Sequence, residues 1–227
     1  MGPGCADCPV LKTSLFQYLT PQQIQRVGCA FRPAQYRRNQ ILFFEGGAAQ
    51  HLFALHTGLV KMVKSLENGK DRITGVLFPG ELFGLESLSD SAYPITAVAL
   101  RDCEICAAPG EEFSTYLQTN PDLAMGMVRF LVGELERVRT QVTDMSFKDA
   151  RMKMATFMLS LLSHDAPATA GNLTLPLSRQ EISEVLELSP ETVSRTMSAF
   201  RREQLVTIRG RQLVIPDRAA LEAVARR

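Results

Sequence analysis

The hydrophobic pattern of this chain changes at Pro121, and the change constrains the fold more than any other feature. Between Gln40 and Pro109, apolar residues form short or alternating runs that are separated by turn residues. Regular spacing of this kind is typical of an antiparallel barrel or sandwich. After Pro121, apolar residues recur every three or four positions, which is the spacing of an amphipathic helix. We therefore expect an α+β chain in which a β-barrel precedes a mainly helical part.

Turn signals bound the strands of the expected barrel. The pair Asn68-Gly69 lies between two apolar runs and predicts a hairpin with a type I′ turn, because both central residues of that turn need positive φ. The runs Ile95–Leu100 and Cys103–Ala108 predict a further pair of strands before the change at Pro121.

One long helix is predicted from Leu123 to Phe147, a segment with no proline and a single internal glycine. Its apolar residues repeat at intervals of three and four, as the a and d positions of a coiled coil do. They are Val128, Leu131, Leu135, Val138, Val142 and Met145. A helix packed on its own barrel is the alternative, but a stripe of about six turns exceeds what one small barrel covers. We expect this helix to pair with its twin in a parallel homodimer.

Capping signals divide the last third of the chain into short helices. After a helical segment at Ala150–Ser163, Ser178 and Glu181 form a capping box, which predicts that a helix starts there. Ser189 then caps a second helix, with Pro190 at its first position. Two short helices joined by a tight turn form a helix-turn-helix, whose second helix enters the major groove of DNA.

The exposed face of this second helix carries three side chains that can read base edges. Glu191, Ser194 and Arg195 are spaced i, i+3 and i+4, so they project together. Arg195 suits guanine O6 and N7, Glu191 suits the amino group of cytosine, and Ser194 suits thymine or a phosphate. In the alternative interpretation, Glu191 and Arg195 form only a surface ion pair.

Further arginines are expected to contact the DNA backbone, where they add affinity and salt sensitivity without sequence information. They are Arg179, Arg201 and Arg202, together with Arg209 and Arg211 at the tip of a predicted hairpin, as in a winged helix. Residues 148–227 carry 12 basic and 9 acidic side chains, whereas residues 1–147 carry 13 and 15. We therefore expect a polyanion to bind the C-terminal part.

Composition narrows the remaining classes of protein. The 227-residue chain has a net charge of +1 and no apolar stretch near the roughly 20 residues of a membrane-spanning helix, so we expect a cytoplasmic protein without a membrane partner. Five cysteines are an odd number in a chain too large to need disulfide staples, which favours free thiols, metal ligands or redox switches. The sequence contains no glycine-rich phosphate loop, metal-protease helix or Ser-His-Asp order, so we do not expect an enzyme.

Five segments combine these signals: Gly58–Lys61, Pro79–Gly84, Gly133–Leu135, Leu177–Ile182 and Ser189–Arg195. Together they resemble the CRP/FNR superfamily of bacterial transcription regulators, over essentially the whole chain. The resemblance implies a cyclic-nucleotide-binding-like β-barrel (jelly roll) in residues 1–120, a dimerisation helix in 121–147 and a winged helix-turn-helix in 148–227. The Glu-x-x-Ser-Arg spacing looks like the FNR branch, which implies a pseudo-palindromic DNA operator with TTGAT-like half-sites and RNA polymerase as a partner.

The effector of the barrel follows from the residues that members of this superfamily use. Cyclic-nucleotide members hold the phosphate with a Gly-Glu-Leu turn and with an arginine before a run of small residues. This chain keeps Gly80, Glu81 and Leu82, but the later stretch Ser91–Val98 contains no arginine. Because burying a phosphodiester without that cation is costly, we do not expect cAMP to bind.

The resemblance to the FNR branch implies an oxygen-sensing [4Fe-4S] cluster, held by N-terminal cysteines and one cysteine of the barrel. Cys5 and Cys8 match the start of the N-terminal group, and Cys106 falls at the barrel position. The third N-terminal cysteine of the family is missing. Cys29 or an oxygen of Asp7 could replace it, although neither lies at matched spacing, so four-thiolate ligation is not established.

Other roles for the cysteines stay open. Cys103-x-x-Cys106 is a second CxxC, which suits zinc, but residues 103 and 106 of one strand would point to opposite faces. A thiol switch would join Cys5 or Cys8 to Cys103 or Cys106, and a structural role would leave the cysteines as small buried hydrophobes. A cysteine-based redox or electron-transfer protein is the alternative to a regulator, but a thioredoxin-type enzyme needs its CxxC between a strand and a helix.

Overall fold

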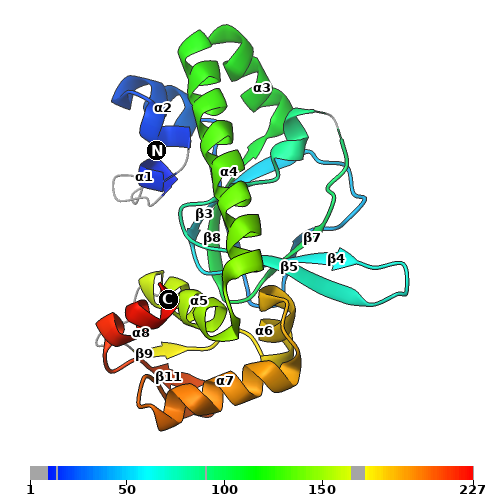
Figure 1. Cartoon of the computed structure of the whole chain (residues 1–227). Coiled ribbons are helices and arrows are strands. Elements are labelled where there is room, and N and C mark those ends of the chain that lie inside the picture. Colours follow the sequence, from blue (N-terminus) through cyan, green and yellow to red (C-terminus); the bar gives the residue numbers. More distant parts are fainter. Residues whose placement is uncertain (1–9, 14, 90, 165–171, 227) are drawn as a thin grey trace. The chain divides into compact units, whose positions relative to one another are not determined.

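The computed structural model describes residues 10–13, 15–89, 91–164 and 172–226, and Figure 1 shows its helices and strands. Within these ranges, the side chains of residues 141 and 144–146 are not described. The chain divides into two compact units, Met1–Val138 (unit 1) and Arg139–Arg227 (unit 2), and the division falls inside helix α4 (Pro121–Phe147). The predicted long helix is confirmed, and it begins two residues earlier than its periodicity indicated.

In the described part of unit 1, two antiparallel four-stranded sheets form the barrel, with strand orders β1-β8-β3-β6 and β2-β7-β4-β5. The strands are β1 (Arg32–Tyr36), β2 (Ile41–Phe43), β3 (His51–Thr57), β4 (Val60–Ser65), β5 (Asp71–Leu77), β6 (Leu82–Phe83), β7 (Thr96–Ala99) and β8 (Cys103–Pro109). Ala54 pairs with Cys106 in the first sheet, and Val60 pairs with Ala99 in the second. The expected α+β class and barrel architecture are confirmed.

A core rich in aromatic rings lies between the two sheets, and we call it the barrel core. Phe43 stacks on Tyr93 with 3.8 Å between ring centroids, and Phe53 stacks on Phe83 at 5.2 Å. The hydroxyl of Tyr93 donates to the carbonyl oxygen of His51 at 2.7 Å, so the one polar group of these four rings is satisfied. The space between the sheets is therefore occupied by the chain's own rings.

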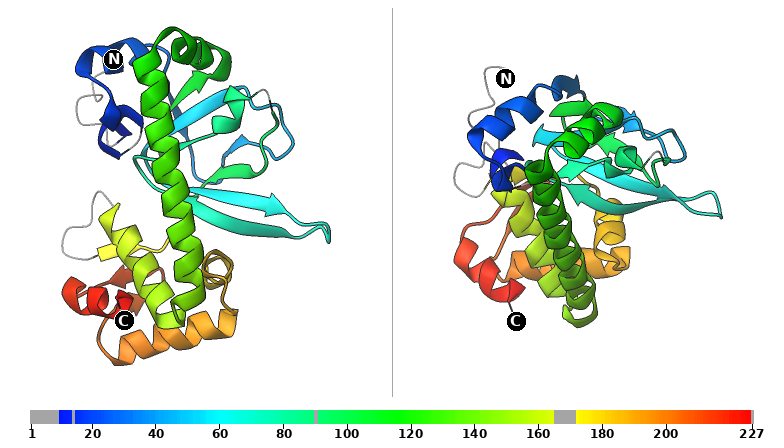
Figure 2. Two further views of the ribbon diagram at one scale, coloured as in Figure 1. Left: turned by 45° about the horizontal axis from the view of Figure 1, so that its top comes forward. Right: turned by 90° about the horizontal axis from the view of Figure 1, so that it is seen from above.

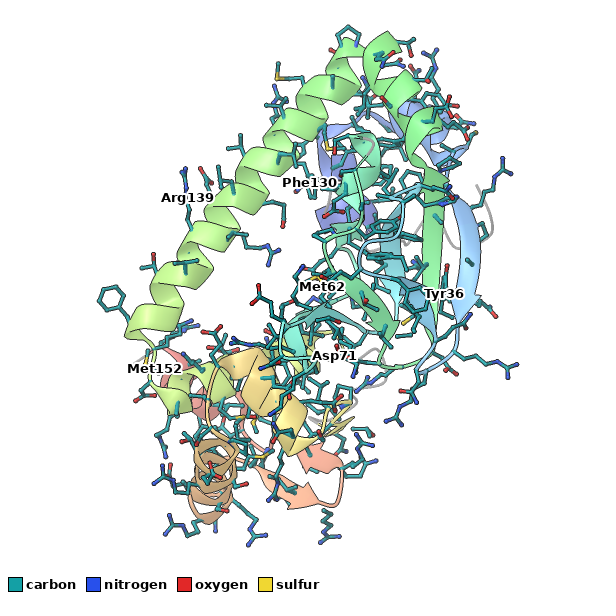
Figure 3. All side chains as sticks on the ribbon, turned by 90° about the vertical axis from the view of Figure 1, so that its right-hand side faces the viewer. Tyr36, Met62, Asp71, Phe130, Arg139 and Met152 are labelled. Atoms are coloured by element: carbon teal, nitrogen blue, oxygen red, sulfur yellow. The ribbon has the colours of Figure 1, made fainter. Side chains whose placement is uncertain are left out.

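A second core, the helical core, joins the sheet β1-β8-β3-β6 to a layer of helices. The helices are α1 (Val10–Thr13), η2 (Leu15–Tyr18), α2 (Pro21–Gly28), η3 (Leu85–Leu88), α3 (Gly110–Thr119) and the first half of α4. From α4 this core receives Leu123, Met127 and Phe130, which are all buried. Figure 3 shows Phe130 on the side of α4 that faces the barrel.

Two strands of the barrel were not predicted from the sequence. Strand β1 lies at a sheet edge and is mostly exposed, so its residues show no apolar alternation. Strand β6 has only two residues, which is too short for a pattern. The sheet edges are therefore the part of the barrel that hydrophobic periodicity does not reveal.

The type I′ turn predicted at Asn68-Gly69 is wrong. Gly69 has a φ of +75°, whereas Asn68 is not among the described residues with positive φ. The N–H of Gly69 donates to the carbonyl of Leu66, and the N–H of Leu66 donates to the carbonyl of Lys70, both at 2.9 Å. These bonds close a three-residue loop, a type I turn followed by a glycine bulge, in which one positive φ suffices.

Unit 2 contains a helix-turn-helix and, in its described residues, a three-stranded sheet of order β10-β11-β9. Its elements are α5 (Ala150–Ser163), β9 (Asn172–Thr174), α6 (Arg179–Leu186), α7 (Pro190–Arg202), β10 (Thr207–Arg209), β11 (Gln212–Val214) and α8 (Arg218–Ala225). Helix α5 lies against α7 and α8 (Figure 2). Met158, Phe200, Leu213 and Leu221 are fully buried in this unit.

The two helices of the helix-turn-helix begin where their caps predict. The hydroxyl of Ser178 accepts from the N–H of Glu181 at 3.2 Å, and the Glu181 carboxylate accepts from the N–H of Ser178 at 2.9 Å. The Ser189 hydroxyl accepts from the N–H of Thr192 at 3.1 Å, which caps α7. Glu187 ends α6 with a φ of +52°, so the chain turns within two residues into the next cap. The predicted helix-turn-helix is confirmed.

Candidate nucleic-acid interface and sensor residues

Helix α7 has one buried and one exposed face. Val193, Met197 and Phe200 point into unit 2 and are buried. Glu191 and Arg195 are exposed on the other side, and Ser194 between them is partly buried. The three predicted base-reading residues therefore lie on the outer side of the helix, as their spacing indicated. Ser198 is exposed three residues after Arg195, and its place seven residues after Glu191 was a signal that our sequence reasoning missed.

The carboxylate of Glu191 interacts mainly with groups at the N-terminal end of α7. Its pKa is lowered first by a hydrogen bond from its own backbone N–H and then by the hydroxyl of Ser189, while the attraction of Arg195 is the smallest of these effects. One guanidinium nitrogen of Arg195 lies 3.5 Å from the hydroxyl of Thr192. An ion pair between Glu191 and Arg195 is thus not the main interaction of either side chain.

Several further arginines of unit 2 are exposed. Arg179 lies in the first turn of α6, Arg201 and Arg202 lie in the last turn of α7, and Arg209 ends β10. Their exposed positive charges are available for the phosphate contacts that the sequence predicts for them.

The predicted wing is a short hairpin of β10 and β11. Arg209 pairs with Gln212, and Gly210 at the first loop position has a φ of +61°, which suits a two-residue turn of type II′. Arg211 lies in the turn of this hairpin, as expected, and its guanidinium donates to the carbonyl of Pro176 at 3.3 Å. Arg211 therefore also fixes the wing to the segment before α6.

The apolar stripe of α4 is exposed in the single chain. Its members Val128, Leu131, Leu135, Val138 and Val142 have 46–61% of their surface exposed, and the side chain of Met145 lies outside the described residues. Met125 and Val132 extend the stripe with similar exposure. The barrel covers a different side of the helix, through the helical core. The apolar residues of the stripe are therefore not explained by packing within unit 1.

The cysteines of β8 face two different cores. The thiol of Cys103 is buried in the barrel core, 3.1 Å from the carbonyl oxygen of Arg101 and 3.3 Å from that of Leu59, and burial raises its pKa. Cys106 is partly buried and packs against the helical core. The expected opposite orientation of residues 103 and 106 is confirmed, which removes the geometric basis for a zinc site on this CxxC.

The other candidate sensor residues are distributed differently. Cys29 is exposed after α2, and its thiol donates to the carbonyl of Gln25 at 3.3 Å. Cys5, Asp7 and Cys8 lie outside the described residues. Among the residues that are described, no three histidine, cysteine or acidic side chains form a group that could hold a metal ion.

The turn that resembles a nucleotide-phosphate turn has partners within the chain. The Glu81 carboxylate accepts from the N–H of Phe78 at 2.7 Å and lies 3.9 Å from a guanidinium nitrogen of Arg137 on α4. The N–H of Gly80 donates to the carbonyl of Leu55. Tyr93 of the arginine-free stretch lies inside the barrel core, and the cation beside Glu81, Arg137, comes from α4 and pairs with Glu134 at 2.7 Å.

Comparison with known families decides the identity of the chain. Residues 33–120 match the cyclic nucleotide-binding domain family, and residues 152–224 match the Crp-like helix-turn-helix domain family. The two matches occur in the order and at the positions of the barrel and the helix-turn-helix. The chain belongs to the CRP/FNR superfamily.

Relatives within the CRP/FNR superfamily cover nearly the full length of the chain. The transcriptional activator protein FnrA of Stutzerimonas stutzeri is 29% identical over 97% of this chain and 92% of that protein. The fumarate and nitrate reduction regulatory protein of Escherichia coli is 25% identical, over 97% of this chain and 90% of that protein. The solved structure of FixK2 from Bradyrhizobium japonicum is 27% identical, with a TM-score of 0.73, over 86% of this chain and 96% of that chain.

These comparisons favour a regulator of transcription. The cysteine-based redox enzyme finds no support in the names of these relatives, which describe transcriptional activators and regulatory proteins. In the described ranges, no helix combines the length and apolar character that crossing a bilayer requires.

Proposed function

We propose that this CRP/FNR-superfamily protein is a homodimeric transcription activator that reads a pseudo-palindromic DNA operator under control of its cysteines. In this proposal, residues 1–120 sense the effector, residues 121–147 pair two chains, and residues 148–227 read DNA. The carrying observation is the outer face of α7, where Glu191 and Arg195 are exposed and Ser194 between them is partly buried. RNA polymerase is the proposed partner on DNA, because an activator must act on that enzyme.

The side chains of α7 indicate which bases are read. The guanidinium of Arg195 forms the fork that matches guanine O6 and N7, and the Glu191 carboxylate accepts from a cytosine amino group. Ser194 adds a short donor near a thymine or a phosphate. This set suits a half-site such as TTGAT, whose guanine and whose complementary cytosine supply the two partners.

The test is a binding titration with duplexes that carry two inverted TTGAT-like half-sites about one helical turn apart. Tight binding to this duplex, together with loss of affinity when the guanine of each half-site is changed, is the expected result. Equal affinity for a scrambled duplex of the same length would refute sequence-specific reading.

The exposed stripe of α4 supports the proposed homodimer. Residues at heptad spacing bury their apolar surface when two such helices lie side by side. The seven described members extend from Met125 to Val142, about 25 Å of helix. A parallel pair of α4 helices would place two copies of α7 on the same side of the dimer, as two inverted half-sites require.

The position of Cys106 supports a sensor that involves the N-terminus. Cys106 packs against the same helical core as Val10, the first residue of α1. Cys8 precedes Val10 by two residues, and an extended chain spans at most about 3.6 Å per residue. We therefore propose Cys106 with Cys5 and Cys8 as the sensor thiols, next to the core that also anchors α4.

The described residues do not complete a four-thiolate site for a [4Fe-4S] cluster. Cys103 faces the barrel core, and Cys29 is exposed with its own partner. When bound, such a cluster would supply the sensitivity to oxygen, with Cys106 as one ligand. A thiol switch is the second candidate, in which Cys106 and an N-terminal thiol give two protons and two electrons to an oxidant and form a disulfide.

Iron and sulfide analysis of anaerobically purified protein, with an absorption spectrum, separates the two candidates. Iron and acid-labile sulfide that are both lost in Cys106→Ser support a cluster. Their absence, with a disulfide on Cys106 found by mass spectrometry after oxidation, supports a thiol switch. If neither is found and Cys106→Ser regulates normally, the sensor proposal is refuted, while DNA reading is tested separately.

A further inference from the structure

A two-pronged ion pair joins the start of α5 to the end of α7. Arg151 lies in the first turn of α5, and its two terminal nitrogens donate to the two carboxylate oxygens of Glu203 at 2.8 and 2.5 Å. Glu203 is the C-cap of α7, where its backbone N–H donates to the carbonyl of Ala199 at 2.9 Å. The guanidinium thus forms a bidentate ion pair with the residue at which α7 ends.

The same guanidinium also covers an aromatic ring of α7. The central carbon of Arg151 lies 5.0 Å from the ring centroid of Phe200, which is fully buried in unit 2. A cation at this distance from a ring is attracted by its π-electrons. Arg151 therefore contacts α7 at two residues that are three positions apart, the carboxylate of Glu203 and the ring of Phe200. Two contact points on one helix constrain both the position and the direction of α7 relative to α5.

The contact with Arg151 also stabilises the charge of Glu203 at the helix end. A carboxylate at a helix C-terminus is disfavoured by the helix dipole. The paired guanidinium offsets that cost, and it lowers the pKa of the Glu203 carboxyl as their hydrogen bonds form. Without Arg151, the Glu203 carboxylate would lose its two hydrogen bonds and its strongest attraction, and only the weaker attraction of Arg202 would remain.

The start of α5 is itself firmly connected to the proposed dimer helix. Only Lys148 and Asp149 separate α4 from α5. The Asp149 carboxylate caps α5 by accepting from the N–H groups of Arg151 at 2.8 Å and Met152 at 2.9 Å. The residue that holds α7 therefore lies two positions after a rigid cap and four positions after the end of α4.

We propose that Arg151 is a positioning residue for DNA reading, which fixes the direction of α7 relative to the end of α4 through Glu203 and Phe200. In a dimer, this direction sets the distance and angle between the two reading helices. The inference rests on the proposed dimeric, DNA-reading function, which it deepens. Arg151 itself need not touch DNA, because it acts through the helix that does.

The test compares binding to two duplexes, one with both inverted half-sites and one with a single half-site. If the direction of α7 is lost, the affinity for the two-site duplex should fall, because the two α7 helices of the dimer can no longer bind both half-sites at once. The affinity for the single-site duplex should change little, because one α7 helix can still bind one half-site. We expect Arg151→Ala and Glu203→Gln each to weaken two-site binding about fivefold and single-site binding less than about twofold. Arg151→Lys should act like Arg151→Ala, because an ammonium lacks the planar fork.

A matched control and a double variant make the test specific. Glu222→Gln removes a carboxylate that pairs with Arg218 at the start of α8 and with Arg226 at its C-cap, and should leave both duplexes unaffected. The double variant Arg151→Ala/Glu203→Gln should be no worse than either single variant, since the partners act as one unit. Thermal melting of each variant checks folding, and Glu203→Gln carries the test if Arg151→Ala does not fold.

The outcomes separate this inference from the proposed function. If the unmodified protein shows no preference for the operator over a scrambled duplex, the proposed function fails. If it shows that preference but the Arg151 and Glu203 variants match Glu222→Gln, only the positioning role is refuted. Equal weakening on both duplexes, or additive losses in the double variant, also overturns the positioning role.

Discussion

Leu135→Glu should convert the dimer into a monomer without unfolding it. Leu135 is 50% exposed in the single chain, so a glutamate there costs the isolated chain little. In the dimer, the exposed half of each leucine would be buried, a gain of about 1 kcal/mol per copy. Two glutamates that face each other at about 8 Å would add about 2 kcal/mol of repulsion at an effective dielectric constant of 20.

These contributions together destabilise the dimer by about 4 kcal/mol, which raises its dissociation constant about a thousandfold. Sedimentation velocity at micromolar concentration measures the change directly, and operator affinity should fall with it because one chain holds only one half-site. Thr140→Glu is the matched control. It adds the same charge to an exposed position of α4 five residues later, about 140° around the helix from Leu135, and should leave the dimer intact. A Leu135→Glu protein that still sediments as a dimer would place the dimer contact elsewhere.

Arg195→Ala should cost about 1–3 kcal/mol of operator affinity and remove discrimination at one guanine. Arg201→Ala should instead weaken binding to all duplexes about equally and reduce the salt dependence of binding. Competition titrations against duplexes with single base changes distinguish the two patterns. cAMP should leave the melting temperature unchanged, although a true ligand at 100 times its dissociation constant would stabilise the fold by about 2.7 kcal/mol, and a cAMP-dependent shift would contradict our interpretation of the barrel. Cys106→Ser should abolish the redox response of operator binding while Cys103→Ser retains it, and the reverse pattern would assign the sensor to the barrel core. The hydrogen bond from the ammonium of Lys64 lowers the pKa of Glu45 below 4.5, so this ion pair should contribute its full stability above pH 4.5 and lose it as the pH falls through the lowered pKa. In denaturant titrations, Glu45→Gln should therefore be as stable as the unmodified protein at acid pH but less stable at pH 7.

Local signals in the sequence predicted the DNA-reading part well. Ser178 and Ser189 fix where two helices begin because a cap needs only residues that lie within one turn of it. The stripe of α4 was likewise visible, since its residues repeat on one face of one helix. Met125 and Val132 extend that stripe on the same spacing, and the structure adds them by their exposure.

Contacts between distant segments could not be predicted in the same way. The pairing of Arg151 with Glu203 joins residues 52 positions apart, and no periodicity relates them. The turn at Asn68-Gly69 was misjudged because its residues suit either of two loop lengths, and strand register decides between them. The identity of the effector stays a proposal, because the N-terminal cysteines match only part of the family's ligand motif. The third N-terminal cysteine of that motif is missing from this chain.

The division of the chain inside α4 has a mechanical consequence. The helix is anchored at Phe130 in the first unit, and its last turns belong to the second unit, about 25 Å further along the axis. A tilt of only about 5° at the anchored end displaces the far end of such a rod by about 2 Å, a shift of the size that repacks subunit interfaces. If α4 moves as one rod, a change smaller than a bond length near the helical core would become a displacement of about 2 Å at the far end of the helix.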